Sequence, residues 1–367
     1  MAAIFVIANE APLNIDKLHI NAVPAPGYEA LFRRTAGWVG ADGDYSIPLS
    51  KDRVLWLFSD TFVGKVEERH RKDCVMINNS AAIQRLDQDA RVEFYYGVNA
   101  DGSPKSLITP DSGEGYFWLF HGALVGENLY LFLMRIVNTG GNSAFAFRGT
   151  GVSLGHVANP HDPPNKWKMT QQNLGCCKYT KNGDISFGSA LLKDGSYIYI
   201  YGFDSTHTDP TGSRGNAMIA ARAPKNQLGD PKTWRFLSGG KWIEDSARCD
   251  PLCYGIATEF SVSYLPAIGK YVCVYISGGI FGQIAVRLSP KPEGPWSDPT
   301  IVYDCPDKHW HEKTFSYAAK AHPELSLTPN ELIVTYATNS MTFSDLIEDA
   351  RLYWPRFVRL VFEKIRQ

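Results

Sequence analysis

Carboxylates stand at the ends of several short apolar segments of this chain, where packing does not require them. Asp60 ends the segment VLWLFSD, Asp42 precedes YSIPLS, and Glu259 precedes FSVSYL. A carboxylate beside a desolvated surface destabilises a fold unless it has partners. Two or three facing carboxyl groups are the minimum equipment for glycoside hydrolysis, because one must deliver a proton while another is ionised. We therefore predict that Asp42, Asp60 and Glu259 are catalytic.

Within this set we expect Asp42 and Asp60 to be the ionised pair and Glu259 to be the acid. Like-charge proximity and partial burial push the pKa values of neighbouring carboxyl groups apart. Each residue also has a simpler explanation, since Asp42 could belong to a turn, Asp60 could cap a loop, and Glu259 could be a solvated charge at a strand end. Their joint occurrence at corresponding places favours the catalytic interpretation.

The elements that must position these groups form a repeat. A short apolar strand, a tight polar turn and a strand rich in aromatic and β-branched residues recur five times, beginning at Tyr45, Phe120, Phe187, Glu259 and Tyr317. The period of roughly 60 to 75 residues is long enough for four strands, which is the unit of a β-propeller. The repeat predicts an all-β, single-domain, five-bladed β-propeller with four-stranded antiparallel blades around a central channel.

The repeat also predicts the boundaries of the blades. They are residues 37–98, 116–170, 184–237, 258–303 and 315–365, with residues 1–36 as a closing strand or an extension. The start of each first strand and the end of each second strand should face the channel mouth, because the hairpin turn lies at the opposite end. One helical segment is predicted, from Met341 to Ala350, with Ser344 as its cap.

Further polar and aromatic residues are predicted to bind substrate at the channel mouth. They are Asp44, Asn79, His121, Arg135, Asp204, Tyr317, His322 and Asn339. Several have structural alternatives. Asp44 and Asp204 could form turns, and His121 and His322 could be histidines satisfied within the fold.

Composition limits the partners that the chain could have. Of 367 residues, 44% are hydrophobic and 20% charged, which is ordinary for a folded protein, and the aromatic share of 13% suits blade packing or stacking against sugars. The net charge of −1 and the lack of a basic run argue against nucleic acid. No apolar stretch reaches the roughly 20 residues of a spanning helix. A carbohydrate is the expected partner, and the sequence does not indicate an oligomeric state.

The first residues and the cysteines leave the compartment open. MAAIFVIANEAP lacks a positive n-region, so no signal peptide is predicted; the protein is secreted or periplasmic if such a peptide has been removed, and otherwise cytoplasmic. Cys249 and Cys253 could form a small disulfide in a secreted protein. The spacing of the seven cysteines does not fit a zinc site. No cofactor is expected to be required, although the channel could hold a structural Ca²⁺ or Na⁺ ion.

Several of these segments carry a family resemblance. GADGDYSIPLSKDRVLWLFSDTFVG, INNSAAIQ, EFSVSYLPAIGKYV, SPKPEGPWSDP, AKAHPEL, VTYATNS and YWPRFVRLVF resemble a bacterial propeller family long catalogued as a domain of unknown function. Some relatives of that family are endo-acting D-arabinanases, and its architecture is related to that of five-bladed arabinanases and invertase-type glycosidases. The resemblance implies acidic catalytic residues in blade one, at Asp42 and Asp60, and places Glu259 and the stretch 317–322 in or near the site.

These observations leave three functional hypotheses. The leading one is a glycoside hydrolase acting on a polysaccharide that contains arabinose or another furanose or pyranose, with inversion favoured by analogy. The second is a carbohydrate-binding propeller without catalysis. The third is a metal-dependent, lactonase-like propeller hydrolase, for which Asn79, Asp204, Glu259 and Asn339 could serve as ligands.

Overall fold

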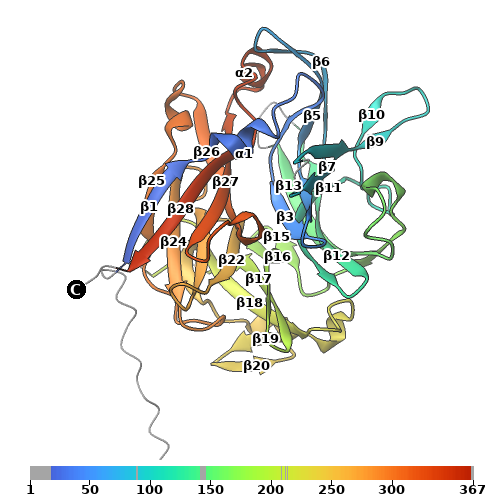
Figure 1. Ribbon diagram of the computed structural model, residues 1–367. Coiled ribbons are helices and arrows are strands. Elements are labelled where there is room, and N and C mark those ends of the chain that lie inside the picture. Colours follow the sequence, from blue (N-terminus) through green and yellow to red (C-terminus); the bar gives the residue numbers. More distant parts are fainter. Residues whose placement is uncertain are drawn as a thin grey trace, which may run out of the picture.

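The computed structural model describes residues 18–87, 90–140, 146–207, 209–210, 212 and 214–364. Among these residues the chain forms many short antiparallel strands and two α-helices, α1 (Pro26–Ala30) and α2 (Phe343–Glu348), with short 3₁₀ turns (Figure 1). The prediction of an all-β fold is confirmed. The apolar start of the chain, to residue 12, lies outside the described residues.

Five sheets follow one another along the chain. The first contains β3 (Tyr45–Pro48), β4 (Arg53–Phe58), β7 (Ser80–Arg85) and β8 (Val92–Tyr95). The second contains β11 (Tyr116–Val125), β12 (Asn128–Asn138), β13 (Phe147–Val157) and β14 (Met169–Asn173). The third contains β15 (Lys178–Thr180), β16 (Gly183–Asp194), β17 (Tyr197–Asp204), β18 (Asn216–Pro224), β19 (Arg235–Ser238) and β20 (Lys241–Ile243), with β21 (Cys253–Ile256) paired to β18.

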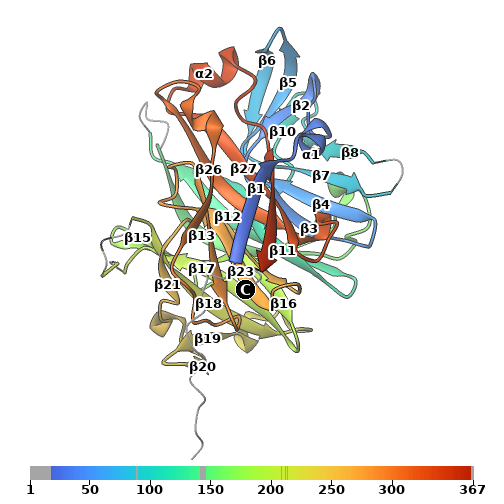
Figure 2. The ribbon, with the colours of Figure 1, turned by 60° about the vertical axis from the view of Figure 1, so that its left-hand side comes forward.

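The last two sheets bring the ends of the described chain together. The fourth contains β22 (Phe260–Leu265), β23 (Lys270–Ile276), β24 (Gln283–Ser289) and β25 (Thr300–Asp304). The fifth contains β26 (Thr314–His322), β27 (Glu331–Ser340), β28 (Arg356–Lys364) and β1 (Leu18–Pro24). In it β1 is the outer strand and runs antiparallel to β28, with Leu18 opposite Lys364 (Figures 1 and 2). The sheet is thus completed by the N-terminal strand, which covers the edge of β28.

One strand from each sheet contacts strands of its neighbouring sheets, so that β3, β11, β16, β22 and β26 form a closed ring. β11 lies against β3 and β16, and β22 lies against β16 and β26. The imidazole of His121 on β11 bridges two strands, because Leu191 N–H donates to its Nδ1 at 2.9 Å and its Nε2 lies 3.1 Å from Ser46 O on β3. Between β26 and β3, His322 Nδ1 lies 2.6 Å from Ser46 Oγ. Residues far apart in sequence therefore meet around one axis.

A smaller sheet departs from the repeat. β2 (Ala36–Ala41), β5 (Thr61–Glu67) and β6 (His70–Ile77) form a three-stranded sheet, and β5 and β6 lie in sequence between β4 and β7 of the first large sheet. Separately, β9 (Gly97–Val98) pairs with β10 (Pro104–Lys105). Figures 1 and 2 show α2 beside β6 at one end of the molecule, and the two elements are in contact. This insertion, which the repeat did not predict, builds one wall of the cavity described below.

Arg71, on β6, holds α2 in place through hydrogen bonds. The side chain is 3% exposed, and its guanidinium donates to Leu346 O at 2.5 Å, to Leu352 O at 2.7 Å and to Val39 O. Buried carbonyl groups at helix ends require such partners. The arginine therefore fixes the position of α2 against the small sheet.

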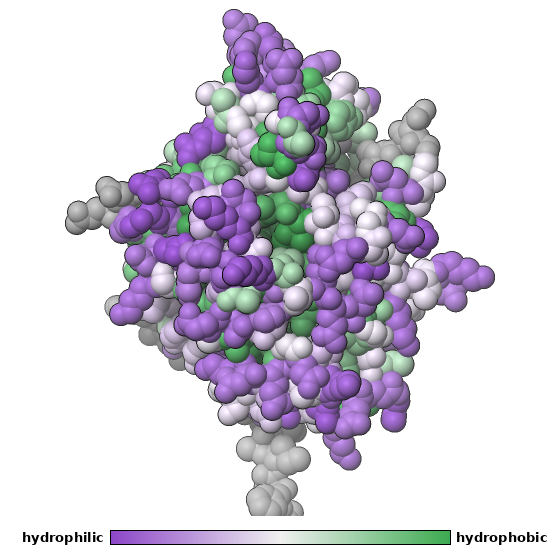
Figure 3. All heavy atoms as spheres, turned by 90° about the vertical axis from the view of Figure 1, so that its right-hand side faces the viewer, coloured by the Kyte–Doolittle hydropathy of each residue, from purple (hydrophilic) through white to green (hydrophobic). Residues whose placement is uncertain are grey.

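Other sequence predictions are changed in detail. The helix expected from Met341 exists as α2, but Thr342 rather than Ser344 is its N-cap residue, and α1, which begins with Pro26, was not predicted. Cys249 and Cys253 are free thiols: Cys249 Sγ donates to Ala220 O at 3.4 Å, while Cys253 begins β21. Among the described residues, no helix is long and apolar enough to cross a membrane. Most of the face in Figure 3 is hydrophilic, with apolar side chains in small groups.

The pairing of β1 with β28 predicts a stability effect. Ile20 packs against the apolar cluster of the last two sheets, whereas the neighbouring His19 is exposed. We expect Ile20→Asp to lower the free energy of unfolding by about 2 kcal/mol, because it removes apolar burial and places a charge there. His19→Asp is the matched control and should change it little. Urea unfolding measures both; equal stabilities of the two variants would contradict the role assigned to β1.

Candidate active site

One cavity of about 370 Å³ collects the three carboxylates predicted to be catalytic. Asp42 comes from the turn between β2 and β3, Asp60 from the turn between β4 and β5, and Glu259 from the residue before β22. Tyr317 and Asn339, both predicted to bind substrate, line the same cavity. The sequence-based expectation that these five residues lie close together agrees with this arrangement.

The two turns that carry Asp42 and Asp60 are bonded to each other through their backbones. Asp42 N–H donates to Asp60 O at 3.2 Å, and Ser59 N–H donates to Asp42 O at 2.9 Å. Gly43 adopts φ +92°, and a Cβ there would lie 2.8 Å from Ser59 N. A glycine is required at this position because both the backbone conformation and the close approach exclude a side chain.

Two tyrosines hold the Asp42 carboxylate. Tyr317 OH donates to Asp42 Oδ2 at 2.5 Å, and Tyr353 OH donates to the same oxygen at 2.9 Å. Asp42 Oδ1 is buried and has no hydrogen-bond partner among the described residues. Ala318, next to Tyr317, has φ +61°, and Tyr353 itself has φ +65°, which is unusual for residues with a side chain. Strained backbone of this kind, at Ala318 and at Tyr353, is typical of a functional site.

Asp60 is held by nitrogen donors. Trp118 Nε1–H donates to Asp60 Oδ1 at 2.9 Å, and Asn78 Nδ2–H donates to the same atom at 3.2 Å. Trp118 projects from β11 and packs edge-on against Phe147 at 4.6 Å between ring centroids. Both donors favour the ionised form of Asp60.

Glu259 has a cationic partner. Lys320 Nζ donates to Glu259 Oε1 at 2.9 Å and to Ala318 O at 2.8 Å. The lysine is 1% exposed, and its Nζ lies 4.4 Å from the centre of the Tyr45 ring. Glu259 and Lys320 therefore form a partly buried ion pair.

Burial raises the pKa of both aspartates, and the charges of neighbouring carboxylates raise that of Asp42 further. The pKa of Asp42 is raised to about 8, first by burial of the carboxyl and then by the charges of Asp60 and Glu259, while the two tyrosine hydroxyls oppose the shift. Burial also raises the pKa of Asp60, to about 6, against the opposing effect of the Trp118 and Asn78 donors. The pKa of Asp42 is thus raised further than that of Asp60.

Asp44 belongs to the same turn but points into the protein. It is fully buried with φ +54°, and neither carboxyl oxygen has a hydrogen-bond partner among the described residues. Burial raises the pKa of Asp44 well above its usual range, with the charge of Lys320 opposing the shift. Asp44 does not line the cavity, so its predicted contact with substrate finds no support in the structure.

Three other residues predicted to bind substrate are occupied within the fold. Asn79 is fully buried and exchanges hydrogen bonds with Ile108 and the Phe117 carbonyl at 2.8 to 2.9 Å. His121 bridges β3 and β16, as described above. The ring of His322 lies between Ser46 Oγ and Thr335 Oγ1, the latter 2.7 Å from Nε2. None of the three lines the cavity, and their polar atoms form hydrogen bonds within the protein.

Arg135 and Asp204 lie outside the cavity as well. Arg135 donates to Ser153 Oγ at 3.1 Å and to Asn173 Oδ1 at 2.5 Å, across β12, β13 and β14. Asp204 Oδ1 accepts from the backbone N–H and hydroxyl of Thr206 at 2.7 and 2.6 Å. Asp204 is thus a turn residue, the alternative that its sequence context had left open.

Sequence reasoning missed the partners of the carboxylates. Trp118, Lys320 and Tyr353 did not stand out because each lies in a segment whose apolar or aromatic pattern already had a packing explanation. The signal available for Lys320 was a lysine within the otherwise apolar strand TFSYAAKAH, which becomes β26. A buried lysine in a strand requires an acidic partner.

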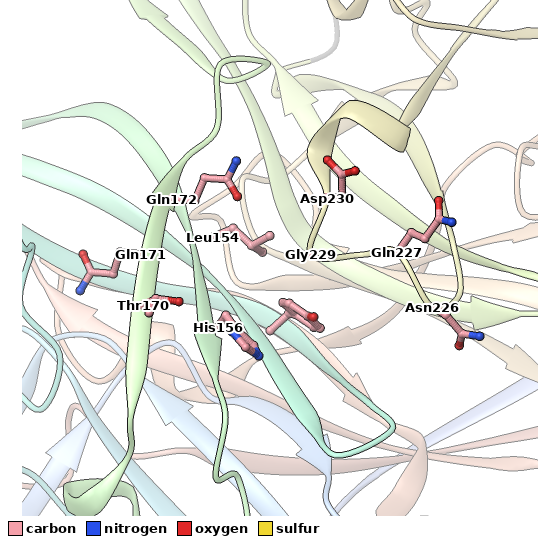
Figure 4. A pocket seen from close by; sticks show the side chains of 10 residues that line it. Leu154, His156, Thr170, Gln171, Gln172, Asn226, Gln227, Gly229 and Asp230 are labelled. Atoms are coloured by element: carbon pink, nitrogen blue, oxygen red, sulfur yellow. The ribbon is translucent and has the colours of Figure 1, made fainter.

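A second cavity of about 370 Å³ lies between the second sheet and the loop after β18 (Figure 4). In Figure 4, Gln172 on β14 and Asp230 on the loop stand on either side of Leu154. Asp230 is the one carboxylate in this lining, and its Oδ1 accepts from Lys232 N–H at 3.2 Å. A lone carboxylate cannot supply an acid and a base together, so the first cavity is the better candidate for catalysis.

Candidate metal ligands do not converge in the part of the chain that the structure describes. Within it, no group of three or more His, Cys, Asp or Glu side chains is arranged to hold a metal ion. Asn79 and Asp204, two of the ligands considered for a metal-dependent hydrolase, are committed to other hydrogen bonds. A Ca²⁺ or Na⁺ ion in the channel stays a prediction from the sequence.

Comparison with known proteins supports the fold. A family described as "Domain of unknown function (DUF5005)" matches residues 26–362. No curated protein matches the chain. A crystal structure of a Bacteroides ovatus protein, provisionally named a hydrolase, is 19% identical, covers 93% of this chain and 90% of its own, and superposes with a TM-score of 0.74. At this identity the likeness shows a shared fold.

Two glycoside hydrolases are more distantly similar. The α-L-arabinofuranosidase of Podospora anserina, crystallised with cellotriose, is 11% identical and covers 89% of this chain and 92% of its own, with a TM-score of 0.48. The GH43_1 enzyme of Xanthomonas citri, crystallised with xylotriose, is 14% identical and covers 93% and 88%, with a TM-score of 0.48.

The raised pKa of Asp42 predicts how stability depends on pH. The folded protein binds this proton more tightly than the unfolded chain, so the associated stabilisation is present at acidic pH and is lost as pH rises through about 8. Asn carries no charge at any pH. The parent should therefore lose stability between pH 5 and pH 9 while Asp42→Asn does not. The free energy of unfolding of the variant minus that of the parent should increase over this range by on the order of a few kcal/mol.

Urea unfolding at both pH values measures this difference. Asp111→Asn is the control, since Asp111 is exposed on the approach to β11. A difference between Asp42→Asn and the parent that stays constant from pH 5 to pH 9 would show that the Asp42 carboxyl titrates as in the unfolded chain.

Proposed function

The chain belongs to the DUF5005 family, and from its site we propose that it is a glycoside hydrolase that uses the carboxyl groups of the first cavity for acid and base catalysis. The observation that carries the proposal is the convergence of Asp42, Asp60 and Glu259 on one cavity, where the pKa of Asp42 is raised further than that of Asp60. We propose that one carboxyl is protonated while its neighbour is ionised at the same pH, which is the pairing that glycosidic bond cleavage requires. The substrate class is a glycan with furanose or pyranose units, including arabinan.

We also infer that the five consecutive sheets are the blades of a five-bladed β-propeller. Two features support this inference. One strand from each sheet contributes to the ring of β3, β11, β16, β22 and β26, and β1 completes the last sheet. The cavity then lies at one mouth of the channel. Such a position is a common place for ligand sites in closed β architectures.

The proposed reaction uses water and the residues of the chain. Asp42 gives its proton to the glycosidic oxygen, and the bond between that oxygen and the anomeric carbon breaks. Water adds its oxygen to the anomeric carbon from the opposite face and gives a proton to Asp60. Exchange with solvent then restores both carboxyl groups. This route inverts the anomeric configuration, which NMR of the first-formed product would report.

The role of Glu259 differs from the one expected from the sequence. Glu259 was the expected acid, but it forms an ion pair with Lys320 at 2.9 Å. The pKa of Asp42 is raised first by burial and then by the charges of Asp60 and Glu259. We propose that these effects together keep the proton on Asp42. Asp42, expected to be ionised, becomes the acid, while Asp60 keeps its expected ionised state.

The two alternative functions have less support. A carbohydrate-binding propeller without catalysis has no need for clustered carboxyl groups whose pKa values are raised. A metal-dependent hydrolase needs several ligands that converge, and Asn79 and Asp204 do not reach the cavity. Turnover of a glycan without loss of activity in chelator would separate the hydrolase proposal from both.

Isosteric variants test the assigned roles. Asp42→Asn and Asp60→Asn should each lower kcat by roughly 10²- to 10⁴-fold, because each removes one proton-transfer group. Asp111→Asn should retain the activity of the parent. The assay is reducing-sugar release from a panel of arabinans, fructans and bacterial cell-wall glycans. Parent-like kcat in both site variants would refute the assignment.

The pKa values of the pair set an expected pH profile. Activity should fall as pH drops through about 6, where Asp60 becomes protonated, and as pH rises through about 8, where Asp42 loses its proton. The dependence of kcat/KM on pH should therefore be bell-shaped with a maximum near neutrality. A rate that continues to rise above pH 9 would be incompatible with Asp42 as the acid.

A further inference from the structure

The walls of the first cavity carry more apolar side chains than the binding of a sugar requires. Around the carboxylates they include Met76, Met134, Phe147, Ile280, Phe343 and Leu346, which come from five different segments. Aromatic rings can stack on the apolar face of a sugar, but methionine, isoleucine and leucine offer no hydrogen bond to its hydroxyl groups. Hydroxyls placed against such walls would lose their bonds to water without replacement.

The neutral polar groups of this cavity are largely engaged within the protein. Asn339 Nδ2–H donates to Tyr317 OH at 3.4 Å, and Asn339 Oδ1 accepts from Ser340 N–H at 2.7 Å. Ser340 Oγ donates to Asp345 Oδ2 at 2.5 Å. Trp118 spends its one donor on Asp60. Apart from the carboxylates, few side chains here remain to bind a hydroxyl-rich ligand.

Two of the apolar side chains are left in water. Phe343, the first residue of α2, is 54% exposed, and Ile280, in the loop between β23 and β24, is 37% exposed. Both line the cavity. Large apolar side chains that stay exposed at the edge of a cavity indicate a surface that a ligand covers.

The wall that carries Phe343 is held in place. Arg71 holds α2 through Leu346 O and the segment after it through Leu352 O, and the Phe343 ring lies 5.9 Å from the ring of Phe62 on β5. An exposed side chain on an anchored element is pre-organised for contact with a ligand. Its exposure is thus a property of the fixed fold.

We propose that the substrate carries an aromatic group next to the glycosidic bond, and that Phe343 and Ile280 form the subsite that receives this group. This inference rests on the proposed hydrolase function and specifies the substrate class. The sugar lies against Asp42 and Asp60, and the aromatic ring occupies the apolar part of the cavity. Methionine sulfur and aromatic edges, as at Met134 and Phe147, make favourable contacts with such a ring.

Matched ligand pairs test the proposal without depending on leaving-group reactivity. The probes are phenyl and methyl glycosides of arabinofuranose, xylopyranose and galactopyranose, in both anomeric forms, and Asp60→Asn is the protein, so that binding is measured without turnover. For the sugar that binds best, the phenyl glycoside should bind about tenfold more tightly than its methyl partner by calorimetry.

The double variant Asp60→Asn, Phe343→Ala should bring this ratio close to one while leaving the affinity for the methyl glycoside unchanged. Asp60→Asn, Tyr264→Ala is the matched control, because Tyr264 is 46% exposed on β22 and does not line the cavity. It should keep the tenfold ratio. Both substituted side chains are exposed, so neither variant is expected to unfold the protein.

The outcomes separate the two proposals. Equal binding of phenyl and methyl partners, or no binding of any phenyl glycoside, would overturn the aromatic subsite, and hydrolysis of other glycans by the parent would leave the hydrolase proposal standing. Tight, Phe343-dependent binding of phenyl glycosides that the parent never hydrolyses would support the subsite and overturn the hydrolase function.

Discussion

The confinement of several carboxyl groups within one cavity is the constraint on which the rest of this structure depends. Asp42, Asp60 and Glu259 line the cavity, and the ammonium group of Lys320 pairs with Glu259. Full ionisation there would combine desolvation with like-charge repulsion. Burial and the neighbouring charges raise the pKa of Asp42, while the hydrogen bonds from Trp118 and Asn78 oppose the rise in the pKa of Asp60.

The fold supplies the precision that such a cluster needs. A ring of strands joined by His121 and His322 brings turns from distant parts of the sequence to one axis. The inserted sheet β2–β5–β6 and helix α2, tied together by Arg71, add an apolar wall on one side. Strained backbone at Ala318 and Tyr353 places the two hydroxyls that hold Asp42. Positioning and burial are thus properties of the same architecture.

The comparison of sequence and structure shows where each kind of inference works. The repeat predicts the all-β class and brings Asp42, Asp60 and Glu259 together, because period and hairpin direction determine which strand ends meet. It does not place Asn79, His121 and His322 in the cavity, because their polar atoms form hydrogen bonds within the protein. The partners within the cluster are not predicted either, since Glu259 pairs with Lys320, a residue 61 positions away in the sequence.

The most direct test of the central claim is a crystal structure of Asp60→Asn with a bound phenyl glycoside. The account predicts the sugar in the first cavity, with its glycosidic oxygen within hydrogen-bonding distance of the Asp42 carboxyl and its anomeric carbon facing residue 60. A glycoside bound only in the second cavity, beside Gln172 and Asp230, or one whose glycosidic oxygen lies away from Asp42, would contradict it.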